Sequence, residues 1–452
     1  MSLSLTSSDP IRENLPDGGY GWICVIAVFL INAHTWGFNS CYTVFLSYYL
    51  SEDLYPNASP LLYALVGGLS ISCGLLVAPL TTLLSNVSGT RLVLNLGVFF
   101  QAITFIGVSF ATQSWHLILS QGICFGIGMG FLFIGSVGII PQWFDRRRGL
   151  AMGITASGSG IGGLIYSLAV GAMIPRLGLP WTFRLLDIVS FVVNAIAGNL
   201  IRDHNQAITG ASTGASRPTI VIFHRPLFHQ SPYLLFIAWG IFSMLGYVTL
   251  LFSISDYALS IGLTSHQASI VSALLNLGQG LGRTFIGFSS DRFGRLNIAA
   301  LFTLFCGVCC LVIWVFATSM GVLCFFVLLA GSIAGTYFAT VSPVLAEIVG
   351  LPDLLSGLSA NWLFLVAPTL VAEPIALVMR NERSADLEYL PVEIFAGCMY
   401  IGGAMCLWVV RASKVCQLSQ GEGEGEKARG WLDHLKQGAR GFVQGAVAIR
   451  KV

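Results

Sequence analysis

Charged residues are scarce in this chain, and their scarcity limits the classes of protein to which it can belong. Asp, Glu, Lys and Arg together make up 10% of the 452 residues, and no lysine precedes Lys414. A soluble chain of this length needs more charge than this to cover its surface. No basic patch with interleaved aromatic residues is present, so nucleic acid is not an expected partner. The sequence therefore argues against both a soluble protein and a nucleic-acid-binding one.

Motifs for enzymatic chemistry are also missing. The sequence contains no phosphate-binding glycine loop, no nucleophile constellation and no cluster with metal-ligand spacing. The 11 cysteines lie mostly inside apolar runs and lack the paired spacing of metal sites. Residues 1–16 are polar, so no cleavable signal peptide is expected. We therefore predict that the chain is not an enzyme or an ATP-driven pump, and that it needs no cofactor and no metal.

What the chain does have is long apolar runs. Apolar residues make up 55% of the sequence, and the mean hydropathy is +0.78. The runs are about 20 residues long, which at about 1.5 Å per residue spans the hydrocarbon core of a bilayer. The alternating segments of about ten residues that mark a membrane β-barrel are absent. The predicted fold class is therefore an all-α membrane protein.

Twelve such runs form two sets of six. The predicted spans are 20–49, 59–84, 91–111, 114–140, 149–172, 181–201, 233–260, 265–288, 297–317, 320–346, 355–379 and 391–411. This layout is typical of a secondary transporter built from two pseudo-symmetric six-helix bundles. The predicted organisation is a cytoplasmic N-terminus (1–19), one bundle (20–201), a cytoplasmic central loop (202–231), a second bundle (232–411) and a cytoplasmic, partly disordered tail (412–452).

The distribution of arginine predicts the orientation. Basic residues gather near the ends of the spans that share a side with both termini and the central loop, whereas the opposite connections carry only Arg176, Arg184, Arg380 and Arg383. The positive-inside rule then places both termini and the central loop in the cytoplasm. Asn57 begins an Asn-Ala-Ser sequon on the outer side and is the candidate glycosylation site, whereas the sequon at Asn86 falls inside.

The loop at 287–295 carries the most specific motif, G-F-S-S-D-R-F-G-R. It resembles the G-x-x-x-D-R-x-G-R loop of the major facilitator superfamily at every motif position. A carboxylate there can cap the next helix and pair with arginines, so we predict that Asp291, Arg292 and Arg295 form a cytoplasmic gate. The corresponding loop of the first half, 86–91, keeps Gly89 but lacks the carboxylate.

Two further segments resemble the monocarboxylate-porter family within that superfamily. Residues 17–22 read D-G-G-Y-G-W, and residues 143–153 read W-F-D-R-R-R-G-L-A-M-G. The first looks like a helix start led by a carboxylate, and in the second Asp145 and Arg146 are predicted gate residues. The resemblance covers about 16–411 and is similar to the fungal branch. It implies a twelve-helix major facilitator fold, most often in the plasma membrane.

Arg283 is the predicted anion site. A cation inside a span is costly and normally faces a cavity or a partner, and a guanidinium binds a carboxylate through two hydrogen bonds. Arg283 also matches the arginine with which monocarboxylate transporters engage the substrate carboxylate; a structural ion pair is the alternative. The other predicted pocket residues are Gln279, Asn276, Asn39, Ser40 and Tyr337.

The resemblance fails at the proton-coupling groups. Animal members have an aspartate four residues before that arginine and a lysine in the first span, whereas this chain has Gln279 and Ser40. Proton symport therefore does not carry over from the family. The candidate coupling residues, in order of preference, are Glu373, Asp187, Asp256 and His34. Alternative roles are neutralisation by Arg184 for Asp187, an interfacial position for Asp256 and a bond to a neighbouring span for His34.

Together these patterns predict a secondary active transporter of a small organic anion or monocarboxylate, working by alternating access. Its expected partners are an anionic small molecule, the lipid bilayer and, if it is coupled, protons. Export of a secondary metabolite is an alternative, because the missing lysine and aspartate weaken the case for lactate-like substrates. A sensor or assembly subunit that has the fold without turnover is the alternative from another class, since fold alone does not settle function.

Overall fold

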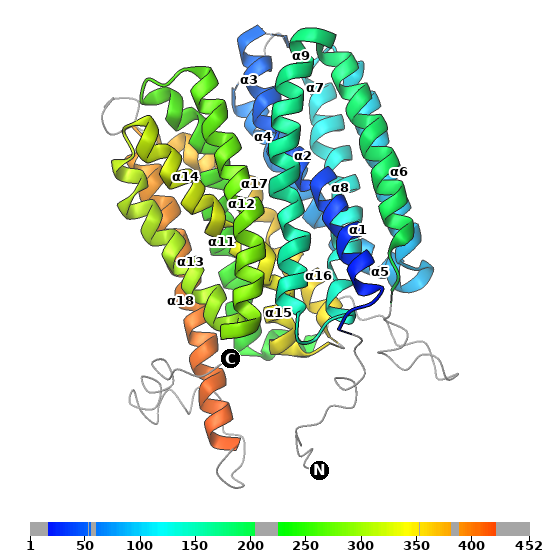
Figure 1. The fold of residues 1–452 in the computed structure, drawn as a ribbon, viewed down its shortest axis with the longest axis vertical. Helices are drawn as coiled ribbons and strands as arrows, with labels where there is room; N and C mark the ends of the chain where they lie inside the picture. The colour runs from blue at the N-terminus through cyan, green and yellow to red at the C-terminus, as the bar shows by residue number, and fades with distance from the viewer. Residues whose placement is uncertain are drawn as a thin grey trace.

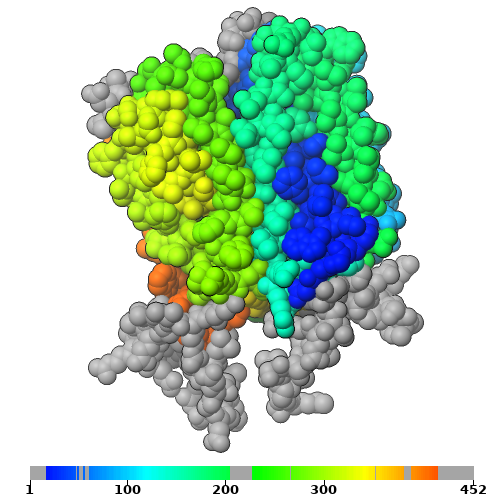
Figure 2. All heavy atoms as spheres, in the orientation of Figure 1, coloured from blue at the N-terminus to red at the C-terminus, as the bar shows by residue number. Residues whose placement is uncertain are grey.

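The computed structural model describes residues 17–52, 54–55, 60–203, 225–351, 353–380 and 388–421. Within these ranges the chain is helical and contains no β-strand. The helices stand side by side in two groups, with the first half of the chain in one and the second half in the other (Figure 1). Figure 2 shows the two halves meeting along a seam that runs the height of the bundle. The predicted glycosylation site, Asn57, lies outside the described residues.

The first half forms six spans, several of which are interrupted. Its elements are α1 (Gly21–His34), α2 (Trp36–Ser40), α3 (Tyr42–Glu52), α4 (Pro60–Leu76), α5 (Ala78–Ser88), α6 (Thr90–Ser109), α7 (Ser114–Leu117), η2 (Ile118–Cys124), α8 (Phe125–Val137), η3 (Ile140–Gln142) and α9 (Arg148–Leu200). The first span breaks at Thr35, where the carbonyl of His34 accepts a hydrogen bond from Gln101 instead of from its own helix. A polar side chain of a neighbouring helix thus satisfies the backbone where the helix is broken.

The second half repeats this pattern. Its elements are η4 (Arg225–His229), α11 (Ser231–Ser260), α12 (Ser265–Phe293), α13 (Arg295–Val312), η5 (Trp314–Phe316), α14 (Met320–Ala334), α15 (Thr336–Val349), α16 (Leu354–Phe364), α17 (Val366–Met379) and α18 (Leu390–Gly421). The span of α14 and α15 is interrupted at Gly335, and the span of α16 and α17 at Leu365. These breaks lie near the middle of the bundle, where a transporter of this layout places its substrate.

The helix count agrees with the twelve predicted spans. Ten helical stretches of the described residues are long and apolar enough to cross a membrane. One of them, α9, has 53 residues, about 80 Å of helix, which is more than twice the thickness of a bilayer core. It turns at Gly178, whose φ of 75° is in the left-handed region, so it supplies two spans. The more polar α12, with 29 residues, is long enough to be the twelfth.

Small residues set the distance between the two halves along the seam. The helices α9 and α12 pack closely because a methyl group at Gly153 or Gly160 would collide with the backbone of α12. On the other side of the molecule α4 packs against α17, where the hydroxyls of Ser72 and Thr369 lie 3.0 Å apart. We call the end of the bundle where α1 begins and α18 ends the terminal face (Figure 1). The sequence predicts that this face is cytoplasmic.

A candidate anion site and a charged network between the halves

Arg283 lies on α12 at the seam, and its side chain is 3% exposed. From the first half it is held by two acceptors on α9, the carbonyl of Ala156 at 3.0 Å and the hydroxyl of Ser159. From its own half it donates to Gln279 Oε1 at 2.6 Å and to Tyr247 Oη at 3.3 Å. The guanidinium therefore bridges the two halves of the molecule.

The charge of this guanidinium is uncompensated. No acidic side chain of the described residues forms an ion pair with Arg283, and its Nε–H group has no hydrogen-bond partner. The nearest compensation is the ring of Phe338, whose centroid lies 5.3 Å from the guanidinium carbon. A buried cation without a counter-ion is costly, so this arrangement favours the arrival of an anion. The geometry excludes the alternative prediction, a structural ion pair, for the described residues.

A small cavity of about 20 Å³ adjoins Arg283, enough for about one water molecule. Its walls come from both halves: Val28, Asn32, Trp36, Ser40, Phe133, Val137, Met152, Thr155, Ala156, Ser159, Tyr247, Arg283 and Phe338. The ring of Trp36 lies 5.0 Å from that of Phe338 and 5.3 Å from that of Phe133. Trp36 Nε1 and Asn32 Oδ1 are buried and have no hydrogen-bond partner. The cavity thus combines aromatic walls with polar groups that are free to bind a ligand.

The structure brings only some of the predicted pocket residues to this cavity. Ser40 lines it, and Gln279 contacts Arg283 directly. Asn276 lies about two helical turns before Arg283 on α12, against Gly163, and its Oδ1 has no hydrogen-bond partner among the described residues. Two residues belong to other contacts: Asn39 donates to Ser70 on α4 at 2.6 Å, and Tyr337 accepts from Asn361 at 2.6 Å inside an aromatic cluster.

Two of the predicted coupling residues, Glu373 and Asp187, form no ion pair with any residue that the structure describes. Glu373 on α17 is 9% exposed, and its Oε2 has no hydrogen-bond partner. Asp187 on α9 also has one unpartnered carboxylate oxygen. The predicted neutralisation of Asp187 by Arg184 is wrong for this structure, because no ion pair between them is described. Arg184 instead lies over the rings of Phe110 and Trp181.

The other two coupling candidates lie away from the cavity. Asp256 is 47% exposed, forms an ion pair with Arg380 at 2.7 Å and accepts a hydrogen bond from Tyr389. This contact matches the interfacial alternative that the sequence suggested for Asp256. His34 lines an apolar pocket between α1 and α9, with its ring 5.6 Å from that of Tyr166. Its Nδ1 has no hydrogen-bond partner among the described residues, so this nitrogen does not make the predicted bond to a neighbouring span.

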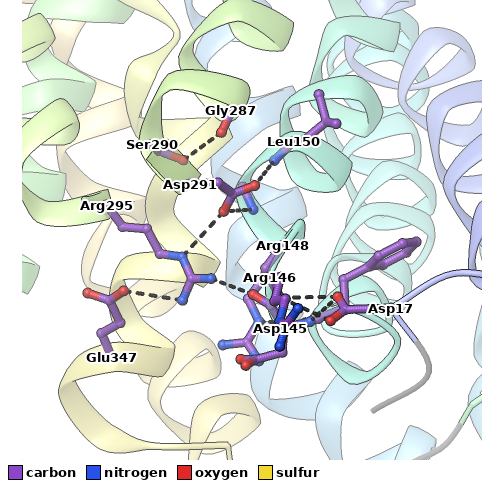
Figure 3. A network of polar contacts seen from close by, with 12 residues as sticks. Asp17, Asp145, Arg146, Arg148, Leu150, Gly287, Ser290, Asp291, Arg295 and Glu347 are labelled. Carbon is purple, nitrogen blue, oxygen red and sulfur yellow. Dashed lines mark hydrogen bonds and ion pairs between the residues drawn. The ribbon is translucent and has the colours of Figure 1, made fainter. Parts of the chain in front are cut away.

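The terminal face carries a charged network that joins the halves (Figure 3). Asp291, at the end of α12, accepts hydrogen bonds from the backbone N–H groups of Gly149 and Leu150, each at 2.8 Å. These residues form the first turn of α9, so a carboxylate of the second half caps a helix of the first half. The motif instead led us to expect a cap on the next helix of the same half. That expectation was wrong in its target and right in its chemistry.

Arg295 extends this network within the second half and back across the seam. It donates to the carbonyl of Asp145 at 2.7 Å and lies 3.7 Å from Asp291. It also pairs with Glu347 on α15 at 3.2 Å, and Glu347 in turn pairs with Lys414 on α18 at 3.5 Å. We call Asp291, Arg295, Glu347 and the segment 145–150 the terminal-face network.

The remaining predicted gate residues have smaller roles in this structure. Arg146 contributes its backbone N–H, which donates to Asp17, while its side chain is exposed. Arg292 is exposed, and its guanidinium lies 5.7 Å from the ring centroid of Phe293. Asp17 was expected to cap its own helix, but the first position of α1 has no side-chain cap. Asp17 instead accepts hydrogen bonds from the N–H groups of Asp145 and Arg146. The two segments that resemble the monocarboxylate-porter family, 17–22 and 143–153, are therefore in contact.

Sequence reasoning missed several residues of both sites. Ser159 belongs to a Gly- and Ser-rich run, where hydroxyls usually serve helix packing. Tyr247 and Phe338 lie in apolar runs with nothing to mark them. Glu347 and Lys414 are separated from Arg295 by at least one helix in sequence, so no local spacing signals their contact.

Comparison with solved structures shows which known fold this chain shares. The structure matches that of the proton:xylose symporter XylE with a TM-score of 0.67, covering 86% of this chain and 95% of that one. The sequences are 14% identical, so the likeness concerns the fold alone. The chain therefore has the same all-helical fold as that membrane protein.

Sequence comparison identifies the family. The model of the Major Facilitator Superfamily matches residues 26–263, more than half of the chain. The probable transporter MCH2 of Saccharomyces cerevisiae is 35% identical over 415 residues, 90% of this chain and 87% of that protein. The Agnestins efflux protein AgnL12 of Paecilomyces divaricatus is 24% identical over 392 residues, 86% of this chain and 87% of that one. The chain belongs to the major facilitator superfamily.

Proposed function

We propose that this protein is a secondary active transporter of the monocarboxylate-porter type that moves small organic anions with one carboxylate. The observation that carries the proposal is Arg283, a buried guanidinium at the seam that lacks an acidic partner among the described residues. In the proposed orientation the terminal face is cytoplasmic, as the arginine distribution predicts, and the host membrane is the plasma membrane.

Arg283 links anion binding to the movement of the halves. Its hydrogen bonds to Ala156 and Ser159 hold α12 against α9. A substrate carboxylate that takes two guanidinium N–H groups competes with these acceptors, because charge-assisted bonds are stronger than neutral ones. Binding then weakens a contact across the seam while it neutralises the buried charge. The substrate thus lowers the cost of rearrangement, as alternating access requires.

The described state is closed around the site. A cavity of about 20 Å³ cannot hold an organic acid, so a substrate enters only when the surrounding helices move apart. Phe338 lies between Trp36 of the first half and Arg283 of the second half, with its ring near both. Its displacement is the smallest change that enlarges the cavity next to the guanidinium.

The terminal-face network serves as the cytoplasmic gate. It joins the first turn of α9 to Asp291 and Arg295 through charge-assisted hydrogen bonds, which are directional and break as a unit when the helix ends separate. Opening to the cytoplasm therefore requires loss of these contacts. This is the gating role that the 287–295 motif suggests.

The test is uptake of labelled lactate, pyruvate and benzoate into proteoliposomes containing the wild type, Arg283→Gln or Arg283→Lys. We expect saturable uptake by the wild type and at least about tenfold less by Arg283→Gln, because a desolvated charge-assisted pair is lost. Arg283→Lys keeps the charge without the planar fork and should give an intermediate rate. Arg292→Gln, which changes an exposed arginine of the same helix, is the matched control.

The opposite result is equally clear. If folded wild-type protein takes up no carboxylate, or if Arg283→Gln transports as well as the wild type, the proposal is wrong. Folding is checked for each variant by size-exclusion chromatography and by thermal unfolding of the purified protein.

Export of a secondary metabolite is the second candidate. It is favoured by the similarity to a protein named as an efflux protein and by the aromatic walls of the cavity. The two candidates are separated by direction and size. An exporter should extrude bulky aromatic carboxylates from preloaded vesicles faster than it moves lactate, whereas a monocarboxylate transporter should show the reverse preference.

A further inference from the structure

We infer that Glu373 is the proton-binding group of this transporter and that its protonation permits closure of the seam between α4 and α17. The inference rests on the proposed transport function and assigns it a driving ion. It stands on the position of Glu373, on the contacts around it and on the absence of an ion-pair partner for its charge among the described residues. The groups that the family resemblance would have supplied, a lysine and an aspartate, are missing here.

The position of Glu373 places it where the halves separate. α16 lies nearer the terminal face and α17 nearer the opposite face, with Glu373 midway along α17 (Figure 1). Just before it, α17 packs on α4 of the first half, where Ser72 donates to the carbonyl of Val366 and touches the Thr369 hydroxyl. Glu373 thus lies one helical turn beyond this contact between the halves, on the side of the opposite face.

The backbone beside Glu373 is adapted to this contact. Pro374 has no N–H group, so the carbonyl of Leu370 one turn earlier loses its helical donor. Gly68 of α4 lies against this carbonyl, at a distance where an added methyl group would be 3.3 Å from the oxygen. The freed carbonyl is thus covered by α4 at a glycine, where no side chain keeps the two helices apart. The region therefore holds two polar groups, a carbonyl and a carboxyl, at the seam.

In the part of the chain that the structure describes, no positively charged side chain pairs with Glu373. The titratable group that acts on it from the first half is Tyr42 of α3, whose hydroxyl already donates to the carbonyl of Tyr63 at 3.0 Å. The titratable side chains of α4 are Tyr63, which lies near Tyr42, and Cys73, which lies against Gly126 of α8. On α11, Tyr247 is bonded to Gln279. α16 carries no titratable residue.

The next acids towards the opposite face belong to other contacts. Asp256 on α11 pairs with Arg380. Glu393 on α18 is buried in the first turn of its helix, a position that favours an acid. Glu373 is therefore a buried carboxyl at the seam for which the described residues supply no cation.

This geometry determines which protonation state fits the closed seam. A carboxylate buried without a partner costs several kcal/mol, whereas a neutral carboxyl costs much less. The closed arrangement of α3, α4 and α17 therefore selects protonated Glu373, and the ionised form favours an open, hydrated seam. In the cycle, Glu373 takes a proton from outside water, the seam closes, and the proton passes to cytoplasmic water once the terminal face opens. One proton then moves inward for each turn.

The experiment compares wild type with Glu373→Gln in proteoliposomes, using the labelled carboxylate that the wild type transports fastest. An inward-acid gradient of one pH unit should drive about tenfold accumulation of a monoanion by the wild type at one proton per anion. Glu373→Gln mimics the protonated form, so it should exchange internal for external substrate without net accumulation. Glu393→Gln, a matched buried acid on another helix, should keep gradient-driven accumulation.

The outcomes separate this inference from the proposed function. Exchange by the wild type without gradient-driven accumulation overturns the inference and leaves the carboxylate transporter intact. Accumulation by Glu373→Gln equal to that of the wild type also overturns it, as does loss of accumulation in Glu393→Gln alone. Retained exchange by Glu373→Gln shows that the variant is folded.

A second measurement needs no substrate. Spin labels at Leu61 on α4 and Val378 on α17, in a chain whose native cysteines are replaced, report the separation of these helices at the opposite face. Lowering the pH from 8 to 5 should shift the wild type towards shorter distances, whereas Glu373→Gln should show the short distance throughout. A pH response in Glu373→Gln equal to that of the wild type overturns the inference even if no carboxylate is transported.

Discussion

The loops 287–295 and 86–91 occupy equivalent places in the two halves and have the same backbone turn. Each follows a helix that ends on a left-handed glycine, Gly294 with φ of 98° and Gly89 with φ of 88°, whose N–H donates to the carbonyl four residues earlier. The two loops differ in their side chains, and the network residues Asp291 and Arg295 correspond to Asn86 and Thr90 in the first half. Asp291 caps α9 across the seam, whereas Asn86, three residues before its glycine like Asp291, is exposed and makes no described hydrogen bond.

The glycine turn and the contact across the seam therefore depend on different residues of these loops. The glycine turn is retained in both halves because it joins two antiparallel helices, whatever happens across the seam. The cross-half contact requires a carboxylate, since two N–H groups at a helix start are best satisfied by two negatively charged oxygens. The terminal face is thus held by charge on the side of α9 and α12. On the other side of the terminal face α5 packs against α16, and Leu355 of α16 lies against Gly138, the residue that follows α8.

Asp291→Asn should have the largest effect, because it removes the charge that caps α9. The amide can accept one of the two N–H groups but carries no charge, and hydrogen bonds to charged groups contribute about 1.5–3 kcal/mol each. We expect hydrogen exchange at the amides of Gly149 and Leu150 to accelerate by about tenfold or more. Asn86→Ala, at the equivalent place in the first half, is the control and should leave these amides unchanged. Equal exchange in Asp291→Asn and wild type would mean that the cap does not hold the gate.

Glu347→Gln should weaken the terminal-face network less than Asp291→Asn does. Its ion pairs with Arg295 and Lys414 are partly exposed, and such pairs contribute about 0.2–1 kcal/mol each. The same amides should exchange roughly two- to fivefold faster. Lys414→Gln removes one of the two pairs and should have a smaller effect than Glu347→Gln. A larger effect for Lys414→Gln would place the control of the gate on α18 instead.

Asn86→Asp should make the two loops more alike, because it gives the first half a carboxylate at the position equivalent to Asp291. An acid near a helix start contributes about 0.3–1 kcal/mol, and α5 packs against α16, whose first residue is Leu354. We expect slower hydrogen exchange in the first turn of α16 and a small rise in the melting temperature. If neither changes, the turn at Gly89 does not bring position 86 within reach of α16, and the halves differ in spacing as well as in charge.

Arg292→Ala should have the smallest effect. The side chain is exposed and contacts only the ring of Phe293 among the described residues, and such changes are usually within about 0.5 kcal/mol. Transport and amide exchange at α9 should both stay within about twofold of wild type. A loss of tenfold or more would show that Arg292 acts in a state of the cycle other than this closed one.

The sequence alone predicted the membrane class, the two halves and most of the spans. Hydrophobic runs report burial in lipid directly, so these elements need no knowledge of tertiary contacts. The boundaries were less accurate where helices extend beyond the bilayer, as α18 does by continuing to Gly421. The break at Thr35 was not predicted either, because its cause is Gln101 of another helix.

The sequence pointed to Arg283 and to its neighbours Ser40 and Gln279, but not to the other residues around the guanidinium. A lone arginine in a span is conspicuous by its cost, and Arg283 was found for that reason. Its partners Ser159 and Tyr247 are ordinary residues of apolar helices, and only the packing of α9 and α11 on α12 makes them neighbours. Asn39 faces α4 instead of the cavity because the interrupted first span rotates its polar residues in different directions.

The most direct test of anion binding by Arg283 is calorimetric titration of the purified protein with a transported carboxylate and with its neutral amide. If Arg283 binds the carboxylate, the wild type should bind the acid at least about tenfold more tightly than the amide. Arg283→Gln should lose this preference while keeping whatever affinity the aromatic walls provide. Equal affinity of the wild type for acid and amide, or an unchanged preference in Arg283→Gln, would contradict the central claim that the buried guanidinium is the anion site.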